Sequence, residues 1–143
     1  MSKLPASNRV TYEDRTRIVW QFIIRSAKKC RGCRKESEDI GAFEADHVIK
    51  RSRSRSLSVN LLNGACMCIP CHRRKHGKDP DAWIQEMHSD RLPELERLSR
   101  VVDPAFSWAV AYEDLWAELV KRGLEPSFRA YLHDRPSIAK LWR

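Results

Sequence analysis

The sequence has no run of about 18 apolar residues, the minimum that a membrane-spanning helix requires. Its first residues also lack the charged and then apolar layout of a secretory signal. These two absences argue against insertion and export, so we expect no membrane partner and a cytoplasmic location. Internal repeats are absent, and low complexity is limited to the alternation of Arg and Ser at 51–56. A chain of 143 residues without repeats is expected to form one compact domain, or one core with an extension.

The five cysteines are all confined to the stretch between positions 30 and 71. An odd number of cysteines at Cys-x-x-Cys spacing favours metal binding over disulfides in a cytoplasmic protein. The two pairs supply four thiolates, the set that closes a tetrahedral structural Zn²⁺ site, whereas a redox dithiol would explain one pair but not the other. The pairs are Cys30 with Cys33 and Cys68 with Cys71. Gly32 is expected to give the first pair its backbone freedom. Cys66 is expected to be a small buried residue, although it could replace one ligand.

Positive charge is concentrated in one half of the chain. Residues 1–78 contain 18 Lys and Arg against 7 Asp and Glu, whereas residues 79–143 contain 9 against 12. A basic surface of this kind suits phosphates, because neutralised phosphates release their counterions on binding. Charge alone is equally compatible with a basic face that contacts only solvent.

Periodicity and capping signals predict the secondary structure. After a loose arm at 1–10, a helix is expected from Thr11 to about Lys28. Apolar runs predict strands at 43–49 and 57–67, with a basic loop at 50–56 between them and a short helix at 71–76 after them. Asp79 is expected to cap a helix that starts at Pro80. Further helices are predicted at 93–102, 107–122 and 126–132, with the Trp side chains of 107–122 in the core. His88 and His133 are expected at the surface.

Chemistry-bearing side chains lie between and just after the cysteine pairs. Hydrolysis of a phosphodiester needs a metal ion to stabilise charge and a base whose pKa is near the working pH, which histidine supplies. Asp46 offers an oxygen ligand, while His72 and His76 are four residues apart and share one face of the short helix. The stretches concerned are Asp46-His47, Asn63-Gly64 and Cys71-His72-Arg73-Arg74-Lys75-His76.

Together with the two cysteine pairs, these stretches closely resemble the HNH nuclease family over residues 30–78. The resemblance implies an α+β fold, with a small ββα-metal (His-Me finger) core and a four-cysteine zinc site. It also implies a DNA endonuclease that uses one catalytic divalent ion, Mg²⁺, Mn²⁺, Ni²⁺ or Zn²⁺. The nuclease core would occupy 30–78, between an N-terminal arm and helix at 1–29 and a helical extension at 79–143. As a small, basic, free-standing HNH protein with a helical tail, the chain resembles those carried by phages and mobile elements.

Carried over from the family, the roles fall on four residues. His47 is the expected general base, Asp46 and His72 are the expected metal ligands, and Asn63 is expected to fix the orientation of the base. His76 matches a third ligand that some members use, and its alternative role is that of a cation at a helix C-terminus. His72 could instead be a spare zinc ligand. Asn60 is also in range, but Asn63 has the family's spacing to His72. Because neighbouring side chains of a strand face opposite sides, the strand must end or bend at Asp46-His47.

The expected substrate contacts are to phosphates and carry little sequence specificity. The basic residues that flank the proposed site are Lys50, Arg51, Arg53, Arg55, Arg73, Arg74 and Lys75. Double-stranded, branched or nicked DNA and structured RNA all remain open as substrates. One motif per chain gives one scission, so a double-strand break needs a homodimer or two nicks. The acidic segment 79–143 could complete the core, form a dimer or recruit a protein. The second functional hypothesis is a non-catalytic zinc-containing module that binds nucleic acid and recruits a partner through this segment.

Overall fold

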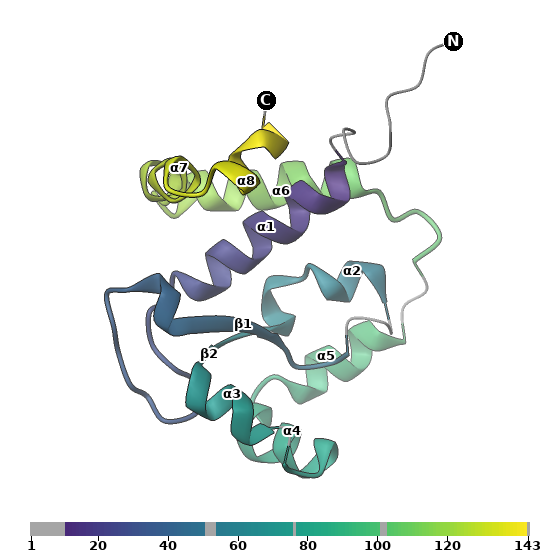
Figure 1. The fold of residues 1–143 in the computed structure, drawn as a ribbon. Helices are drawn as coiled ribbons and strands as arrows, with labels where there is room; N and C mark the ends of the chain where they lie inside the picture. Colours follow the sequence, from purple (N-terminus) through teal and green to yellow (C-terminus); the bar gives the residue numbers. More distant parts are fainter. Residues whose placement is uncertain (1–10, 51–53, 76, 101–102, 143) are drawn as a thin grey trace. The chain divides into compact units, whose positions relative to one another are not determined.

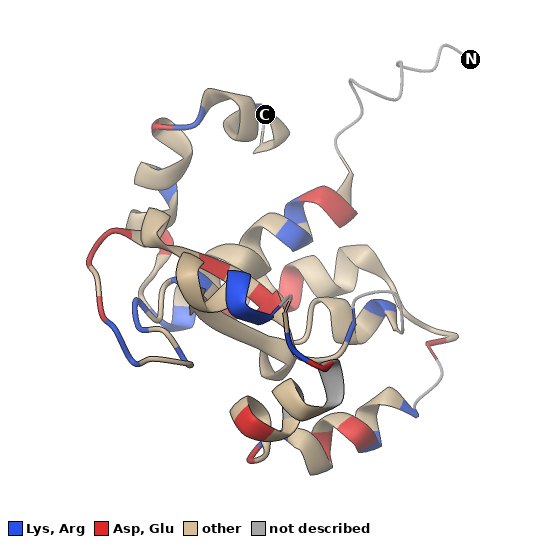
Figure 2. Ribbon diagram, turned by 60° about the horizontal axis from the view of Figure 1, so that its bottom comes forward, with Lys and Arg blue, Asp and Glu red and all other residues tan. Residues whose placement is uncertain are grey.

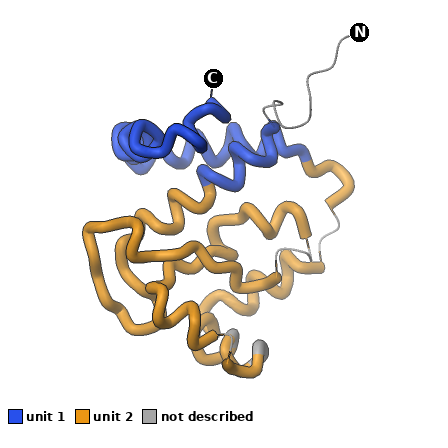
Figure 3. Tube along the Cα trace, viewed as in Figure 1, with its two compact units in different colours: residues 1–19, 107–143 blue, residues 20–106 orange. Residues whose placement is uncertain are grey.

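The computed structural model describes residues 11–50, 54–75, 77–100 and 103–142 (Figure 1). The arm expected at 1–10 therefore lies outside the described residues. The chain divides into two compact units, residues 1–19 with 107–143 and residues 20–106 (Figure 3). In the described part of the chain, no helix is both long and apolar enough to cross a bilayer.

A two-stranded antiparallel ribbon forms the centre of the unit at 20–106. Strand β1 (Phe43–His47) pairs with β2 (Gly64–Cys68), with Phe43 opposite Cys68 and His47 opposite Gly64. Helix α3 (Ile69–Lys75) follows β2 directly, so the order is strand, strand, helix. Every residue of β2 is buried, and the ribbon shares a core with Cys30, Cys71 and Trp83. The expected mixed α+β fold with a ββα core is confirmed.

The prediction of a strand at 57–67 was wrong in its first half. Residues Arg55–Ser58 form the short helix α2, and residues Leu61–Asn63 form the 3₁₀ helix η4. Polar side chains cap both elements: Ser54 Oγ accepts a hydrogen bond from Leu57 N, and Asn60 Oδ1 accepts one from Leu62 N. Such side-chain caps compete with strand pairing, and an apolar pattern does not register them.

The helix that precedes the first cysteine pair packs closely on β2 through its residues from Trp20 on. Helix α1 (Tyr12–Arg25) starts at Thr11, whose Oγ1 accepts from Asp14 N at 3.1 Å, as the capping pattern predicted. Its later part lies so close to β2 that a Cβ at Gly64 would overlap the Ile24 side chain and lie 3.0 Å from Trp20 Cζ2. Glycine at this position therefore reflects close approach of helix and strand.

Two further helices of this unit follow α3. Helix α4 (Pro80–His88) is capped by Asp79, which accepts from Ala82 N at 3.0 Å. Helix α5 (Leu92–Ser99) contributes Leu95 to a cluster with Val48, Ile49 and Leu57. The hydrophobic core therefore extends beyond the cysteine-containing segment into α5.

The expectation that His88 lies at the surface was wrong. Its side chain is fully buried at the end of α4, and Arg31 Nε donates a hydrogen bond of 3.1 Å to its Nδ1 atom. Arg31 also pairs with Asp90, so this arginine joins the first cysteine pair to the end of α4. His133, in contrast, is exposed as expected.

The second unit is helical in its C-terminal part. It contains α6 (Trp108–Lys121), α7 (Glu125–His133), α8 (Pro136–Ala139) and the 3₁₀ turn η5 (Lys140–Trp142). Gly123 ends α6 with φ of 71°, a left-handed conformation that glycine adopts without strain. Phe128 is fully buried, with its ring centroid 5.8 Å from that of Trp116 and 5.3 Å from that of Trp142. The buried residues described in 107–143 are Leu115, Leu119 and Phe128, whereas Trp108 and Trp116 are only half-buried, so the prediction that these Trp side chains lie in the core was wrong in degree.

The buried His88 should make the stability of the protein depend on pH. Burial and the nearby charges of Arg31 and Arg91 lower the pKa of His88 to about 4, whereas an unfolded histidine titrates near 6.5. Between these values the unfolded chain binds a proton that the folded protein does not, so the free energy of unfolding falls as the pH falls. We expect His88 to contribute at most about 3 kcal/mol to this loss.

Urea unfolding at pH 7 and pH 5 measures the effect in the wild type and in His88→Gln, whose amide oxygen can still accept from Arg31. The variant should lose less stability than the wild type over this interval. An equal loss in both proteins would contradict the assignment.

Candidate functional site

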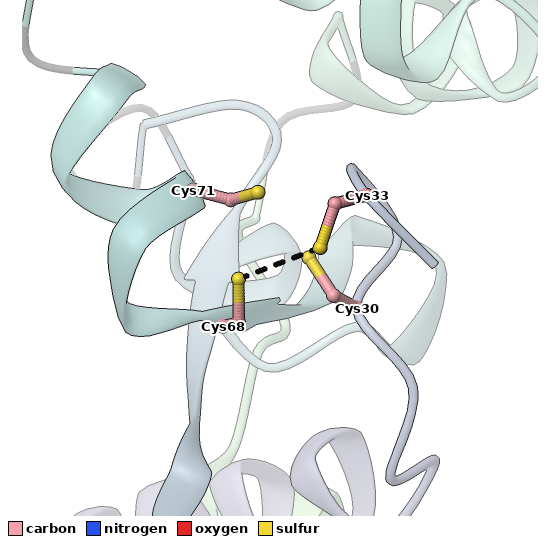
Figure 4. Close-up of side chains that lie close together, drawn as sticks. All are labelled: Cys30, Cys33, Cys68 and Cys71. Atoms are coloured by element: carbon pink, nitrogen blue, oxygen red, sulfur yellow. Dashed lines mark hydrogen bonds between the residues drawn. The ribbon is translucent and has the colours of Figure 1, made fainter. Parts of the chain in front are cut away.

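Four cysteines converge on one point between the first cysteine pair and the start of α3. Their Sγ atoms all lie within 4.8 Å of one another, and those of Cys33 and Cys68 are 3.7 Å apart (Figure 4). A tetrahedral site with Zn–S bonds of about 2.3 Å places its sulfurs about 3.8 Å apart. The donor set and the spacing therefore fit a structural metal ion, as the two Cys-x-x-Cys pairs predicted.

The electrostatics of the cluster favour a bound cation. Burial raises the pKa of Cys30, but backbone amides of Cys68, Cys33 and Gly32 outweigh it and lower that pKa to about 6. Burial raises the pKa of Cys68 to about 12, and side-chain hydrogen bonds with the other thiols add to the shift. The Cys30 thiolate is thus stabilised, whereas Cys68 resists ionisation. A divalent cation would relieve this conflict by compensating the charge of all four.

The loop of the first pair is fixed by backbone hydrogen bonds. Cys30 N donates to Lys35 O at 2.8 Å, and Arg31 N donates to Cys66 O at 2.8 Å, which joins the loop to β2. The left-handed residue is Arg34, with φ of 67°, so the expected conformational role of Gly32 was wrong. Space is tight there, because a Cβ would lie 3.3 Å from Cys71 Sγ.

Cys66 is separate from the metal-binding group. It is 6% exposed on β2, and burial raises the pKa of its thiol. Among the described residues, the group that could hold a metal ion contains the other four cysteines without it. The expectation of a small buried residue is confirmed.

A second polar cluster lies between β1 and α3. His72 Nε2 is 3.5 Å from Asp46 Oδ1, and His72 Nδ1 is 2.5 Å from Glu44 Oε2. Glu44 and Asp46 are two residues apart on β1 and therefore lie on the same side of the strand. Figure 2 shows this acidic strand beside the basic helix α3. Lys75 Nζ donates to both carboxylate oxygens of Asp46, each at 2.8 Å, and to the carbonyl of His47 at 3.3 Å.

His47 is the last residue of β1. Its ring contacts α1 and α2, whereas the Asp46 side chain contacts α3. The imidazole stacks on Trp20 of α1 at a centroid distance of 4.3 Å and an interplanar angle of 15°. Its Nε2 atom is 2.8 Å from the carbonyl oxygen of Ser58, at the end of α2. A carbonyl only accepts, so Nε2 carries a proton in this contact.

Asn63 is fully buried and holds the backbone of the segment that connects the two strands. Its Oδ1 atom accepts from Ile49 N at 2.8 Å, and its Nδ2 atom donates to Ile49 O at 3.1 Å and to Leu57 O at 3.0 Å. Both ends of the 49–57 segment are therefore fixed by one amide. Asn60 caps η4, and its carbonyl accepts from Trp20 Nε1 at 3.0 Å.

The basic residues chosen from the sequence differ in their surroundings. Lys50 and Arg73 are exposed, and Arg55 Nη2 donates to Asp103 O at 3.2 Å. Arg74 Nη2 donates to Cys71 Sγ at 2.6 Å, so this arginine supports the cysteine cluster. Arg51, Arg53 and His76 lie outside the described residues.

The part of the chain that contains these two clusters matches a known protein family. Residues 30–78 match the HNH endonuclease family. The matched segment is about a third of the chain, and no curated protein and no solved structure matches the sequence. The HNH segment contains all four clustered cysteines, both strands and α3. An HNH domain indicates a nuclease or a nucleic-acid-binding function, and the resemblance drawn from the motifs is confirmed.

Three residues of the site were missed from the sequence: Glu44, Ser58 and Trp20. Glu44 could have been found, because the alternation of a strand places it beside Asp46. The stacking of Trp20 on His47 and the use of the Ser58 carbonyl have no signal in the sequence. Both depend on where α1 and α2 lie relative to β1.

Loss of one cysteine ligand should unfold the HNH segment. Zinc binding is worth about 10–16 kcal/mol in finger peptides, which is comparable with the whole stability of a domain. In Cys33→Ser we expect loss of bound zinc, measured by atomic absorption, together with loss of the cooperative thermal transition in circular dichroism. Cys66→Ala is the matched control, since that thiol lies outside the cluster. A Cys33→Ser protein that melts like the wild type without zinc would refute the structural role.

Proposed function

We propose that the HNH segment is a metal-dependent DNA endonuclease in which His47 is the general base and Asp46 and His72 hold one divalent ion. The observation that carries this proposal is the arrangement of His72, with one ring nitrogen on Glu44 and the other directed at Asp46. Metal-binding histidines commonly use their second nitrogen in this way, because a carboxylate fixes the ring and raises its basicity.

The spacing of the two proposed ligands suits a small divalent ion. Two ligand atoms bound side by side at about 2.1 Å from an ion lie about 3.0–3.4 Å from each other. Asp46 Oδ1 and His72 Nε2 are 3.5 Å apart, which requires little movement. A bound divalent ion would stabilise negative charge on the phosphate and on the leaving oxygen.

His47 has the features that a general base requires. The Ser58 carbonyl holds a proton on Nε2, and in this proposal Nδ1 is the atom that would take the proton of a water molecule. The resulting hydroxide would form a new bond to phosphorus as the P–O bond to the leaving oxygen breaks, and that oxygen would take a proton from solvent. We place the scissile phosphate at the end of β1, where Asp46 and His47 are neighbours.

DNA would be held mainly through its phosphates. Lys50 and Arg73 are exposed and suited to this role, whereas Arg55, Arg74 and Lys75 have partners within the protein. Binding by about 6–10 such contacts weakens by roughly 10³- to 10⁵-fold between 50 mM and 200 mM salt.

One contact favours the second functional hypothesis, a zinc-containing module that binds nucleic acid without cutting it. Lys75 Nζ lies 2.8 Å from both oxygens of Asp46, so an ammonium group already neutralises the proposed metal ligand. If that ion pair persists in the presence of divalent ions, Asp46 binds no metal. The two hypotheses therefore differ in a measurable property, the affinity of this cluster for Mn²⁺.

Replacement of Glu44 by Gln should weaken the binding of the catalytic ion. Loss of a carboxylate that supports a metal-binding histidine typically costs about 10- to 100-fold in metal affinity. Isothermal titration of the zinc-loaded protein with Mn²⁺ should give this change for Glu44→Gln and no binding for Asp46→Ala. Glu38→Gln is the control, because Glu38 pairs with Lys28 instead. Equal Mn²⁺ affinity in Glu44→Gln and the wild type would contradict the role of Glu44.

Cleavage of a supercoiled plasmid tests the proposed function itself. With Mg²⁺, Mn²⁺ or Ni²⁺, the wild type should convert the plasmid to nicked or linear DNA. His47→Ala should cut about 10²- to 10⁴-fold more slowly, because a positioned base is lost, while its zinc content and DNA binding stay unchanged. His133→Ala, at an exposed position, is the matched control. Equal cutting by His47→Ala would exclude this base. A wild type that fails to cut the plasmid with any of the three metals would favour the binding module.

A further inference from the structure

Asp103, which follows α5 and lies outside the HNH segment, makes an unusually dense set of hydrogen bonds. Its carboxylate accepts from Ser54 Oγ at 2.8 Å, from Ser56 Oγ at 2.5 Å and from Ser56 N at 3.2 Å. Its carbonyl accepts from Arg55 Nη2 at 3.2 Å. All these partners are at the start of α2, 47 to 49 residues away in the sequence.

The helix that Asp103 holds is too short to be stable on its own. Helix α2 has four residues, and an isolated helix in water needs about 12–15. Ser54 is 8% exposed and uses one Oγ atom twice, donating to Asp103 and accepting from Leu57 N as the cap of α2. The cap is therefore oriented by the carboxylate. Two residues outside α2 therefore fix it at both ends. Asp103 holds its start, and Asn63 binds the Leu57 carbonyl near its end.

The same helix positions the proposed base. Its last residue, Ser58, is 1% exposed and directs its carbonyl at His47 Nε2. Ser58 N donates to Ser54 O at 3.0 Å, so hydrogen bonds at Ser54 and the single turn of α2 link Asp103 to the imidazole. A displacement of the Ser58 carbonyl would remove the group that holds a proton on His47 Nε2.

We propose that Asp103 is a positioning residue for His47 and acts through α2, so that the part of the chain between the HNH segment and residue 106 completes the nuclease site. This proposal rests on the proposed function for its catalytic meaning, and on the hydrogen bonds above for its structural meaning. The serines and the backbone amide outweigh burial and keep the pKa of Asp103 below its usual value, so the residue is a carboxylate at neutral pH. As an anion it makes stronger hydrogen bonds than a neutral side chain would.

The test compares Asp103→Ala and Asp103→Asn with Glu94→Ala. Glu94 lies on α5 and pairs with Arg97 of the same helix, so its removal deletes a carboxylate from the same extension without affecting α2. Small displacements of catalytic groups cost up to about 10²-fold in rate. We expect kcat for plasmid cleavage to fall about 10- to 100-fold in Asp103→Ala, to recover partly in Asp103→Asn and to stay unchanged in Glu94→Ala. Zinc content should be equal in all three variants.

A second readout does not depend on cleavage. In ¹⁵N-labelled protein the proton on His47 Nε2 should give an imidazole signal typical of a hydrogen-bonded N–H, assigned by its loss in His47→Ala. Asp103→Ala should shift or broaden this signal, whereas Glu94→Ala should leave it unchanged. If the wild type does not cut DNA, the proposed function fails while this signal still tests the positioning.

The proposal is overturned if Asp103→Ala leaves both kcat and the His47 signal as in the wild type, or if Glu94→Ala changes them equally. It is also overturned if kcat falls without any change in the His47 signal, because Asp103 would then act by another route. If Asp103→Ala melts near the assay temperature, Asp103→Asn and Ser56→Ala replace it. Each removes part of the contact set, and the same two readouts decide.

Discussion

The attraction between four crowded thiolates and a divalent cation is the interaction on which the rest of this structure depends. The cysteines join three segments: the loop at Cys30–Cys33, the end of β2 and the start of α3. Without a cation, four thiolates within 4.8 Å of one another would repel in a largely buried cluster. With it, α3 is held against the ribbon, and that placement brings His72 to the acidic side of β1.

The two sides of the proposed site are supported differently. Asp46 and His72 depend on the cysteine cluster, because α3 begins at the residue after Cys68. His47 depends on α1 and α2, through Trp20 and the Ser58 carbonyl. Elements outside the HNH segment also support this second side: Leu95 of α5 contacts the cluster that contains Leu57, and Arg91 donates to the carbonyls of Leu62 and Gly64 on either side of Asn63. In our account the HNH segment and residues 79–106 therefore form one functional unit.

The sequence predicted those parts of the fold that depend on local signals. The caps at Thr11, Asp79 and Ser107 start helices where expected, and the spacing of the cysteines predicted a cluster that the structure contains. Prediction from the sequence failed where tertiary contacts determine the conformation or the burial of a residue. Leu57 has an apolar side chain that suits a strand, yet the Ser54 cap makes it helical, and the polar His88 is buried through Arg31. The candidate site was predictable as a set of residues, but not the contacts that orient them.

The most direct test of the account is the location of metal ions in crystals grown with zinc and soaked in Mn²⁺. Anomalous scattering should place zinc among the four cysteine sulfurs and Mn²⁺ between Asp46 and His72, with the Lys75 ammonium displaced from the carboxylate. Zinc among the sulfurs, but Lys75 still bonded to Asp46 and no Mn²⁺ beside His72, would contradict the proposed catalytic centre.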